Sequence, residues 1–193
     1  RVQKRKGKEN PNHSGEEPYN YFLSVIFPHD EVQILDYNRV IKDLNGLTSD
    51  QFLDATKKQF TVFHLDEEAP SVSATSICML LKGRWYQITA TEGIQSDDPV
   101  DGLQASLLQN HLLSPILGID DPRTNDRIDF VGGIRGMEEL ERRCKTDCAL
   151  AFALHPVNVE QLLSVADSGK VMPPKSTWFE PKLRSGLVVR LLD

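Results

Sequence analysis

The stretch CALAFAL, residues 148–154, is apolar at every position and is followed directly by His155-Pro156. A strand that is exposed on one face alternates apolar and polar side chains, so an uninterrupted apolar run indicates burial on both faces. Proline has no backbone N–H to donate to a ladder, and it therefore marks the end of such a strand. We predict that residues 148–154 form a central strand and that the fold is built around it.

Similar stretches predict further strands. Residues 19–27, YNYFLSVIF, stop at Pro28 and predict a second central strand over 21–27, which would form a hairpin with residues 32–37. Residues 77–81 and 85–89 flank Lys82-Gly83-Arg84, which is typical of a hairpin. Shorter strands are predicted over 127–131 and 187–192.

Four segments carry helical signals. Thr48-Ser49-Asp50 offers N-cap residues to a helix of about three turns. Helical spacing of apolar residues predicts further helices over 103–113, 137–145 and 159–166, the last of them closed by Ser168-Gly169. Hairpins dominate the first half, and helices alternate with strands in the second. The predicted class is α+β (mixed α/β), a mixed sheet with several packed helices.

The composition argues against several classes of function. The 193 residues are 39% hydrophobic and 26% charged, which is typical of a globular protein. A net charge of -6 argues against sequence-independent binding of nucleic acid, and no apolar run is long enough for a membrane span. Three cysteines without a disulfide framework indicate a cytoplasmic protein. The five histidines lack zinc-site spacing, so no metal site is predicted.

The stretch KSTWFEPKLRSGL, residues 175–187, places cations and hydroxyls on a loop that aromatic residues and prolines should order. Ammonium, guanidinium and hydroxyl groups suit a phosphate or carboxylate ligand. The candidate ligand-binding residues of this loop are Lys175, Ser176, Thr177, Lys182, Arg184 and Ser185. A purely structural clamp on the last predicted strand is the alternative.

A second candidate lies in FVGGIRG, residues 130–136, between a predicted strand and a predicted helix. Gly132 and Gly133 would let the backbone approach an anion closely, and Arg135 could bind it in a bidentate manner. A tight turn without a ligand is equally open. We expect these three residues to converge with the 175–187 loop on one concave surface.

In two further charged segments, we expect the charges to form ion pairs rather than a binding site. In DYNRVIKDLNGL, residues 36–47, helical spacing would put Arg39, Lys42 and Asp43 on one face as a surface ion-pair cluster. The charges of residues 116–130 are expected to pair among themselves around a proline turn.

Three long segments carry a resemblance to a known family. They are GEEPYNYFLSVIFPHDEVQILDYNRVIKDLNGL (15–47), LLSPILGIDDPRTNDRIDFVGGIRGMEELE (112–141) and VMPPKSTWFEPKLRSGL (171–187). Together they resemble the C-terminal half of domain-of-unknown-function family 1015, whose members are twice this length. The resemblance implies an upstream half with an Asp-Gly-His-His-Arg motif like that of ParB-like nucleotide-handling enzymes, including free-serine kinases. That motif does not occur in this sequence.

The resemblance implies a division of the chain and a function. Residues 1–18, which begin with a basic run suited to a helix C-terminus, would be the end of a preceding helix and a linker. Residues 19–193 would form the C-terminal α/β domain of a longer cytoplasmic enzyme that binds a small phosphorylated or carboxylated metabolite. Phosphotransfer linked to serine is the reaction suggested, and any nucleotide cofactor would need the N-terminal half. A non-catalytic ligand-binding or regulatory domain is the alternative, and no catalytic residue is assigned.

Overall fold

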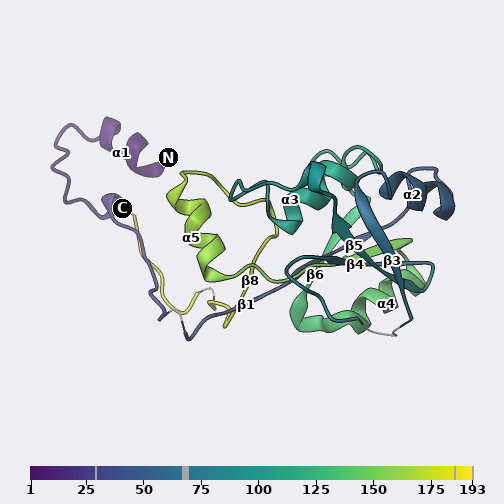
Figure 1. Cartoon of the computed structure of the whole chain (residues 1–193). Helices are drawn as coiled ribbons and strands as arrows, with labels where there is room; N and C mark the ends of the chain where they lie inside the picture. Colours follow the sequence, from purple (N-terminus) through teal and green to yellow (C-terminus); the bar gives the residue numbers. More distant parts are fainter. Residues whose placement is uncertain (29, 67–69, 185, 193) are drawn as a thin grey trace. The chain divides into compact units, whose positions relative to one another are not determined.

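The computed structural model describes residues 1–28, 30–66, 70–184 and 186–192. The chain divides into two compact units, a larger one of Gln33–Glu180 and a smaller one of Arg1–Val32 with Pro181–Asp193. Figure 1 shows the course of the chain through both. The candidate site lies in the larger unit.

A sheet forms the centre of the larger unit. Its six described strands follow the order β3-β5-β4-β7-β2-β6, and each neighbouring pair is antiparallel. The bounds are β2 Tyr37–Ile41, β3 Phe60–Leu65, β4 Ile77–Leu81, β5 Arg84–Ala90, β6 Ile128–Gly132 and β7 Leu150–Ala153. Strand β7 lies between β4 and β2, and all four of its residues are buried. The predicted central position of this strand is confirmed.

Helices cover both faces of this sheet (Figure 1). They are α2 Ser49–Thr56, α3 Gln104–Leu108 with a π-helical turn Gln109–Leu113, and α4 Gly136–Thr146. The larger unit also contains α5 Val159–Asp167. Phe52 of α2 and Leu108 of α3 pack against Phe152 on one face. Leu140 of α4 packs against Ala151 on the other. The predicted α+β class and the four predicted helices are confirmed.

Local chemistry explains several boundaries. Thr48 Oγ1 accepts a hydrogen bond from the backbone N–H of Gln51 at 3.2 Å, and Gln51 Oε1 accepts one from the Thr48 N–H at 2.9 Å. This capping box satisfies free N–H groups at the start of α2. Lys82 and Gly83 both have positive φ, 50° and 72°, in the two-residue loop between β4 and β5. That backbone conformation matches the twist of the paired strands and confirms the predicted hairpin.

The segment 36–47 differs from the prediction. Tyr37–Ile41 is strand β2, so Arg39 does not share a helical face with Lys42 and Asp43. Arg39 is buried, and Asp43 pairs with Arg127 at 2.6 Å instead. The β-branched pair Val40-Ile41 fits a pleated strand between two neighbours better than a surface helix.

The predicted hairpin of 21–27 with 32–37 is also wrong. The short strand β1, Gln33–Leu35, pairs with β8, Trp178–Glu180, in a separate two-stranded sheet. Both ends of the larger unit are therefore joined by one antiparallel ladder. An apolar pattern indicates that a strand can form, but the partner is chosen by contacts distant in sequence.

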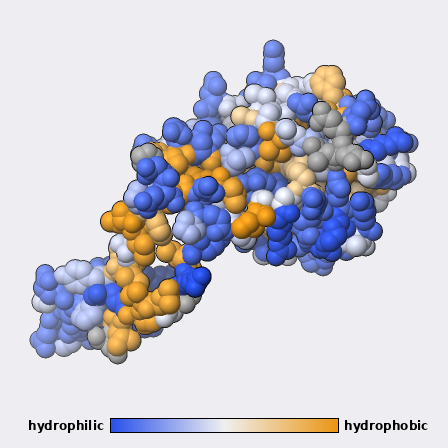
Figure 2. Space-filling view, turned by 90° about the horizontal axis from the view of Figure 1, so that it is seen from below, coloured by the Kyte–Doolittle hydropathy of each residue, from blue (hydrophilic) through white to orange (hydrophobic). Residues whose placement is uncertain are grey.

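The smaller unit contains α1, Val2–Glu9, and a 3-10 turn, Pro18–Asn20. Residues 21–27 and 187–192 do not form strands, which contradicts both predictions. Phe22 is 83% exposed and Ile26 91% exposed, and Figure 2 shows a continuous apolar surface on this unit. An apolar strand is buried only where other elements cover it, and the described part of this unit provides no such cover.

The remaining short elements are the 3-10 turns Glu92–Ile94 and Gly133–Arg135. Among the described residues, no helix has the length and apolar character that crossing a membrane requires.

Candidate functional site

The candidate site is a cavity of about 80 Å³ at the end of the sheet where β2 begins and β7 stops. Antiparallel pairing brings the start of β2, the end of β7 and the end of β6 to the same edge. The polar residues that line the cavity are Tyr37, Arg39, Gln104, His155, Asn158, Gln161 and Ser176. They come from β2, α3, α5 and two loops.

Arg39 is the central residue of the cavity. Its side chain lies on the α3 face of β2 between its pairing partners Phe130 and Phe152, and the residue is only 4% exposed. The guanidinium donates to the backbone carbonyl of Tyr37 and lies 5.6 Å from the Phe130 ring centroid. Among the described residues, no carboxylate forms an ion pair with it. A buried charge is normally paired, so this arginine has capacity for an anion.

Burial changes the pKa of the Arg39 guanidinium. Desolvation disfavours the charged form and lowers the pKa of its guanidinium to about 10. The side chain nevertheless stays protonated at neutral pH. The cavity therefore contains a permanent positive charge in an environment where water screens it poorly.

The charges around the cavity are unevenly distributed. The described residues that line it include no aspartate or glutamate. A groove of about 500 Å³ shares Arg39 and Ala105 with the cavity but is lined by Asp101, Asp120 and Asp121. The small cavity, rather than the groove, is therefore the favourable place for an anion.

Residues 116–130 contribute ion pairs near this groove. Arg123 binds Asp121 through Nε and Nη2, both at 2.9 Å, as the prediction of self-paired charges expected. Arg127 binds Asp43 and also donates to the Leu117 carbonyl at 2.8 Å. These contacts satisfy the two arginines within the protein itself.

Gln104 fixes the loops around the cavity. Its Oε1 accepts from the backbone N–H of His155 at 2.9 Å, and its Nε2 donates to the Ser73 carbonyl at 2.8 Å. His155 Nδ1 lies 2.9 Å from the Pro156 carbonyl oxygen. Because a carbonyl can only accept, Nδ1 is the donor in this contact.

Asp36 lies beside the cavity, immediately before β2. Asn38 donates to its carboxylate, while Asn38 Oδ1 accepts from the Leu154 N–H at 2.9 Å. Burial raises the pKa of the Asp36 carboxyl, and the hydrogen bond from Asn38 opposes that rise. A Cβ on Gly133 would lie 1.8 Å from Asp36 Oδ1, so only glycine fits against this carboxylate.

The structure brings four predicted residues to this end of the sheet. The ammonium of Lys175 lies 5.4 Å from the centroid of the Tyr37 ring, and the buried Ser176 hydroxyl donates to the Pro173 carbonyl at 2.8 Å. Gly132 is in register with Tyr37, and the Gly133 N–H donates to the Asp36 carbonyl at 2.9 Å. Thr177 follows Ser176 and is half-buried.

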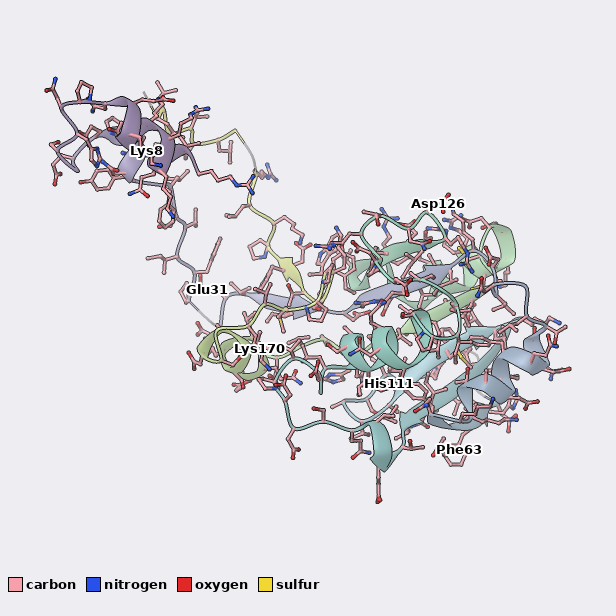
Figure 3. All side chains as sticks on the ribbon, turned by 90° about the horizontal axis from the view of Figure 1, so that it is seen from above. Lys8, Glu31, Phe63, His111, Asp126 and Lys170 are labelled. Atoms are coloured by element: carbon pink, nitrogen blue, oxygen red, sulfur yellow. The ribbon has the colours of Figure 1, made fainter. Side chains whose placement is uncertain are left out.

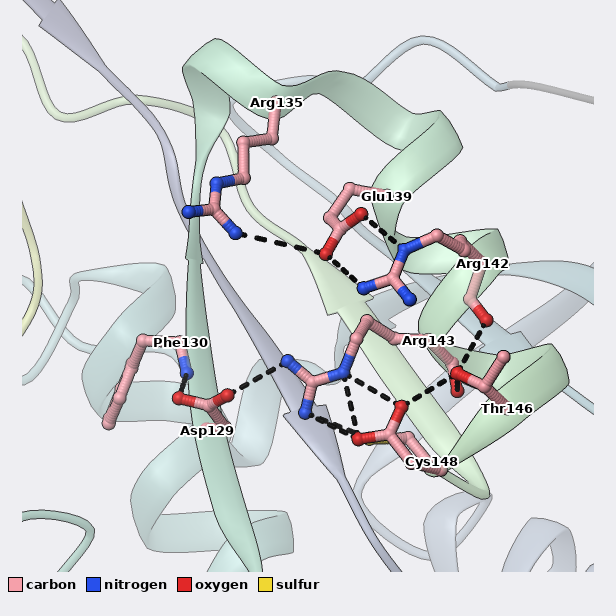
Figure 4. Close-up of polar contacts among 9 residues, drawn as sticks. Asp129, Phe130, Arg135, Glu139, Arg142, Arg143, Thr146 and Cys148 are labelled. Carbon is pink, nitrogen blue, oxygen red and sulfur yellow. Dashed lines mark hydrogen bonds and ion pairs between the residues drawn. The ribbon is translucent and has the colours of Figure 1, made fainter.

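Other predicted residues are not brought to the cavity. Arg135 is 65% exposed, and its Nη1 lies 3.8 Å from Glu139 of α4, which also binds Arg142 (Figure 4). Lys182 and Arg184 belong to the smaller unit, so their convergence with the cavity stays a prediction. Ser185 lies outside the described residues.

Sequence reasoning missed the most buried polar residues of the site, Asn38 and Arg39, and gave no role to Asp36 or Gln104. A period of two would have placed Arg39 on the same strand face as Ile41, a core residue. An arginine on the apolar face of a strand would have indicated a buried charge. The helical interpretation placed Arg39 on the surface instead. The described residues contain no cluster of His, Cys, Asp or Glu that could hold a metal ion.

Comparison with protein families gives a match. The family model described as "Protein of unknown function (DUF1015)" matches residues 1–108. The chain belongs to the DUF1015 family. The resemblance seen in the sequence is confirmed to that extent, and placement of this DUF1015 chain in the C-terminal half stays a prediction. No curated protein matches it.

Comparison with solved structures also gives matches. A mutant free serine kinase in complex with ADP matches with a TM-score of 0.50 and 17% identity, over 81% of this chain and 58% of that chain. A free serine kinase in complex with AMP matches with a TM-score of 0.48 and 15% identity, over 78% and 54%. A conserved hypothetical protein from Pyrococcus furiosus matches with 0.49 and 12%, over 78% and 56%. The DUF1015 chain thus spans little more than half the length of these structures.

Proposed function

We propose that this chain is the anion-binding part of a phosphotransfer enzyme that acts on a small phosphorylated or carboxylated metabolite. The observation that carries the proposal is Arg39, a buried guanidinium without a carboxylate partner among the described residues. Phosphoryl transfer depends mainly on positioning and on stabilising charge, and a preorganised buried arginine supplies both.

The comparisons support the reaction class. A protein with this fold is a free serine kinase, and its structure contains ADP. We propose phosphotransfer linked to serine metabolism on this ground. The nucleotide contacts and the acid–base groups would then come from the N-terminal half of a longer protein, for which residues 1–18 would be a helix end and linker and 19–193 the C-terminal domain.

The smaller unit supports such a partner half. Its residues 21–27 and 187–192 expose large apolar side chains, including Phe22, Ile26 and Val189. Contiguous apolar surface of this kind marks a site of protein contact. We propose that the remaining half of the same protein covers it.

Titration calorimetry with inorganic phosphate tests the anion site. We expect Arg39→Gln to weaken phosphate binding by about tenfold or more, since a charge-assisted contact is lost. Arg127→Gln is the matched control, because Arg127 is already bound to Asp43 and lies outside the cavity lining. Equal phosphate affinity in the wild type and both variants would refute the proposal.

A kinase assay on the longer protein tests the reaction. We expect phosphoserine to form from free serine when ADP or ATP is the phosphoryl donor. Phosphate binding at Arg39 without any turnover would instead support a non-catalytic ligand-binding or regulatory domain.

A further inference from the structure

Lys175 is a second cation beside the cavity, because it contacts the lining residue Tyr37 and directly precedes the lining residue Ser176. Its Nζ lies 3.5 Å from the Tyr37 hydroxyl and 5.4 Å from the centroid of the Tyr37 ring. Among the described residues, no carboxylate forms an ion pair with it. Tyr37 therefore contacts two cations, because its backbone carbonyl accepts from Arg39 while Lys175 faces its ring.

The backbone holds Lys175 in this place. Its φ of 57° is in the left-handed region, which disfavours residues with a Cβ. Two other described non-glycine residues have positive φ, Asn45 and Lys82, and Lys82 belongs to the β4–β5 hairpin. At Lys175 the turn is held by Pro173, Pro174 and the Ser176 hydroxyl bond to the Pro173 carbonyl. Such local strain is typical of functional sites.

Other titratable groups lie in and around the cavity. His155 lines it, and the half-buried Asp36 lies beside it, immediately before β2. Three aspartates, Asp101, Asp120 and Asp121, line the adjoining groove, which Arg39 also lines. The described cavity lining itself contains no acid. Arg39 in the lining and Lys175 beside Tyr37 thus meet no carboxylate of the described cavity lining.

We propose that the cavity binds a phosphate dianion and that Lys175 is the residue that selects phosphate monoesters over carboxylates. This rests on the proposed anion site and names its ligand class. A single cation balances a monoanion such as a carboxylate. Adding a second cation favours a dianion about twice as strongly as a monoanion, because the Coulomb energy scales with the product of the charges.

A matched pair of small ligands tests this inference. Methyl phosphate is a dianion above a pH of about 6, while methyl sulfate has the same shape and keeps one charge. We expect wild-type protein to bind methyl phosphate about tenfold more tightly than methyl sulfate or acetate at pH 8. The preference should shrink at pH 5. Any titration of His155 or Asp36 would change the binding of both ligands. A pH effect on methyl phosphate alone therefore comes from the charge of the ligand.

Variants separate this inference from the proposed function. Lys175→Met keeps an unbranched side chain, one atom shorter, but removes the charge, so it should cut the methyl phosphate preference to about threefold or less. Lys58→Met, at an exposed lysine after α2, should leave it unchanged. A preference that survives Lys175→Met, or no preference in the wild type, overturns the inference. If Arg39→Gln changes the binding of neither ligand, the proposed anion site itself is wrong.

Discussion

Two arginines of this chain are shielded from water but differ in whether a carboxylate pairs with them. Arg143 is shielded from water but binds Asp129 at 2.8 Å and Asp147 at 2.8 Å (Figure 4). Arg39 is more deeply buried and binds only a carbonyl and an aromatic face. Because a buried charge without an ion pair is costly, Arg39 is expected to lower stability in exchange for ligand binding.

The stability of Arg39→Met tests that expectation. We expect its free energy of unfolding in urea to equal or exceed that of the wild type by about 1–3 kcal/mol, since an apolar side chain replaces a desolvated charge. Arg143→Met should instead lose about 1 kcal/mol, because its carboxylate partners remain. A large loss of stability in Arg39→Met would mean that the arginine serves structure alone.

Asp98 gives a prediction for acid stability. The hydrogen bond from Lys170, at the C-terminal end of α5 (Figure 3), and the N–H groups of Val100 and Asp101 lower the pKa of its carboxyl to about 2. A lowered pKa gives stability that is present above pH 3.8 and is lost as the pH falls towards 2. We expect Asp98→Asn to flatten the fall of the melting temperature between pH 4 and 2, measured by circular dichroism.

The partner residue provides the control. Lys170→Met should flatten the same pH range, and the double variant should resemble either single variant because the two residues share one contact. Additive effects of the two changes would show that the Asp98–Lys170 contact is not the cause.

At the level of elements, β6 and β8 meet at a glycine. A Cβ on Gly132 would lie 2.4 Å from Cε3 of Trp178, whose indole also packs edge-on against Tyr37 with centroids 5.4 Å apart. We expect Gly132→Ala to displace the indole and to cost about 1–3 kcal/mol of stability through overpacking. Tryptophan fluorescence and urea unfolding measure the two effects.

Gly93 is the matched control for that change. It has no positive φ, and nothing lies within 4 Å of the Cβ that alanine would add. Gly93→Ala should therefore be neutral or slightly stabilising. If both substitutions behave alike, the Gly132–Trp178 contact does not constrain this end of the sheet.

At the level of the whole molecule, the two units should differ in resistance to proteolysis. Chymotrypsin cleaves beside aromatic residues, and Phe22 and Phe63 are both exposed, at 83% and 58%. Phe63 lies in β3 (Figure 3), where its backbone is held in a ladder, while Phe22 lies in a segment outside any strand. We expect cleavage within 21–27 first, followed by a stable product close to residues 33–180 in mass spectrometry. Early cleavage at Phe63 would contradict this picture.

Much of the larger unit was determined by the sequence itself. The central strand at 148–154, the β4–β5 hairpin and the four helices were predicted because their signals are local: uninterrupted apolarity, a turn residue, a cap. Lys175 and Ser176 were also recognised from their chemistry, and the structure places them beside Tyr37. Nearby residues are sufficient to specify such features, since hydrogen bonding and burial within one element need no distant information.

The tertiary structure decided the rest. Asn38 meets Leu154 across 116 positions of sequence, Gly133 meets Asp36, and β1 pairs with β8 rather than with 21–27. The burial of Arg39 follows from its two flanking strands and α3, so its charge could not be recognised as unpaired before those elements were assembled. Residues 21–27 are apolar in sequence but exposed in the structure. Burial of apolar side chains is favourable, yet it occurs only where another surface covers them.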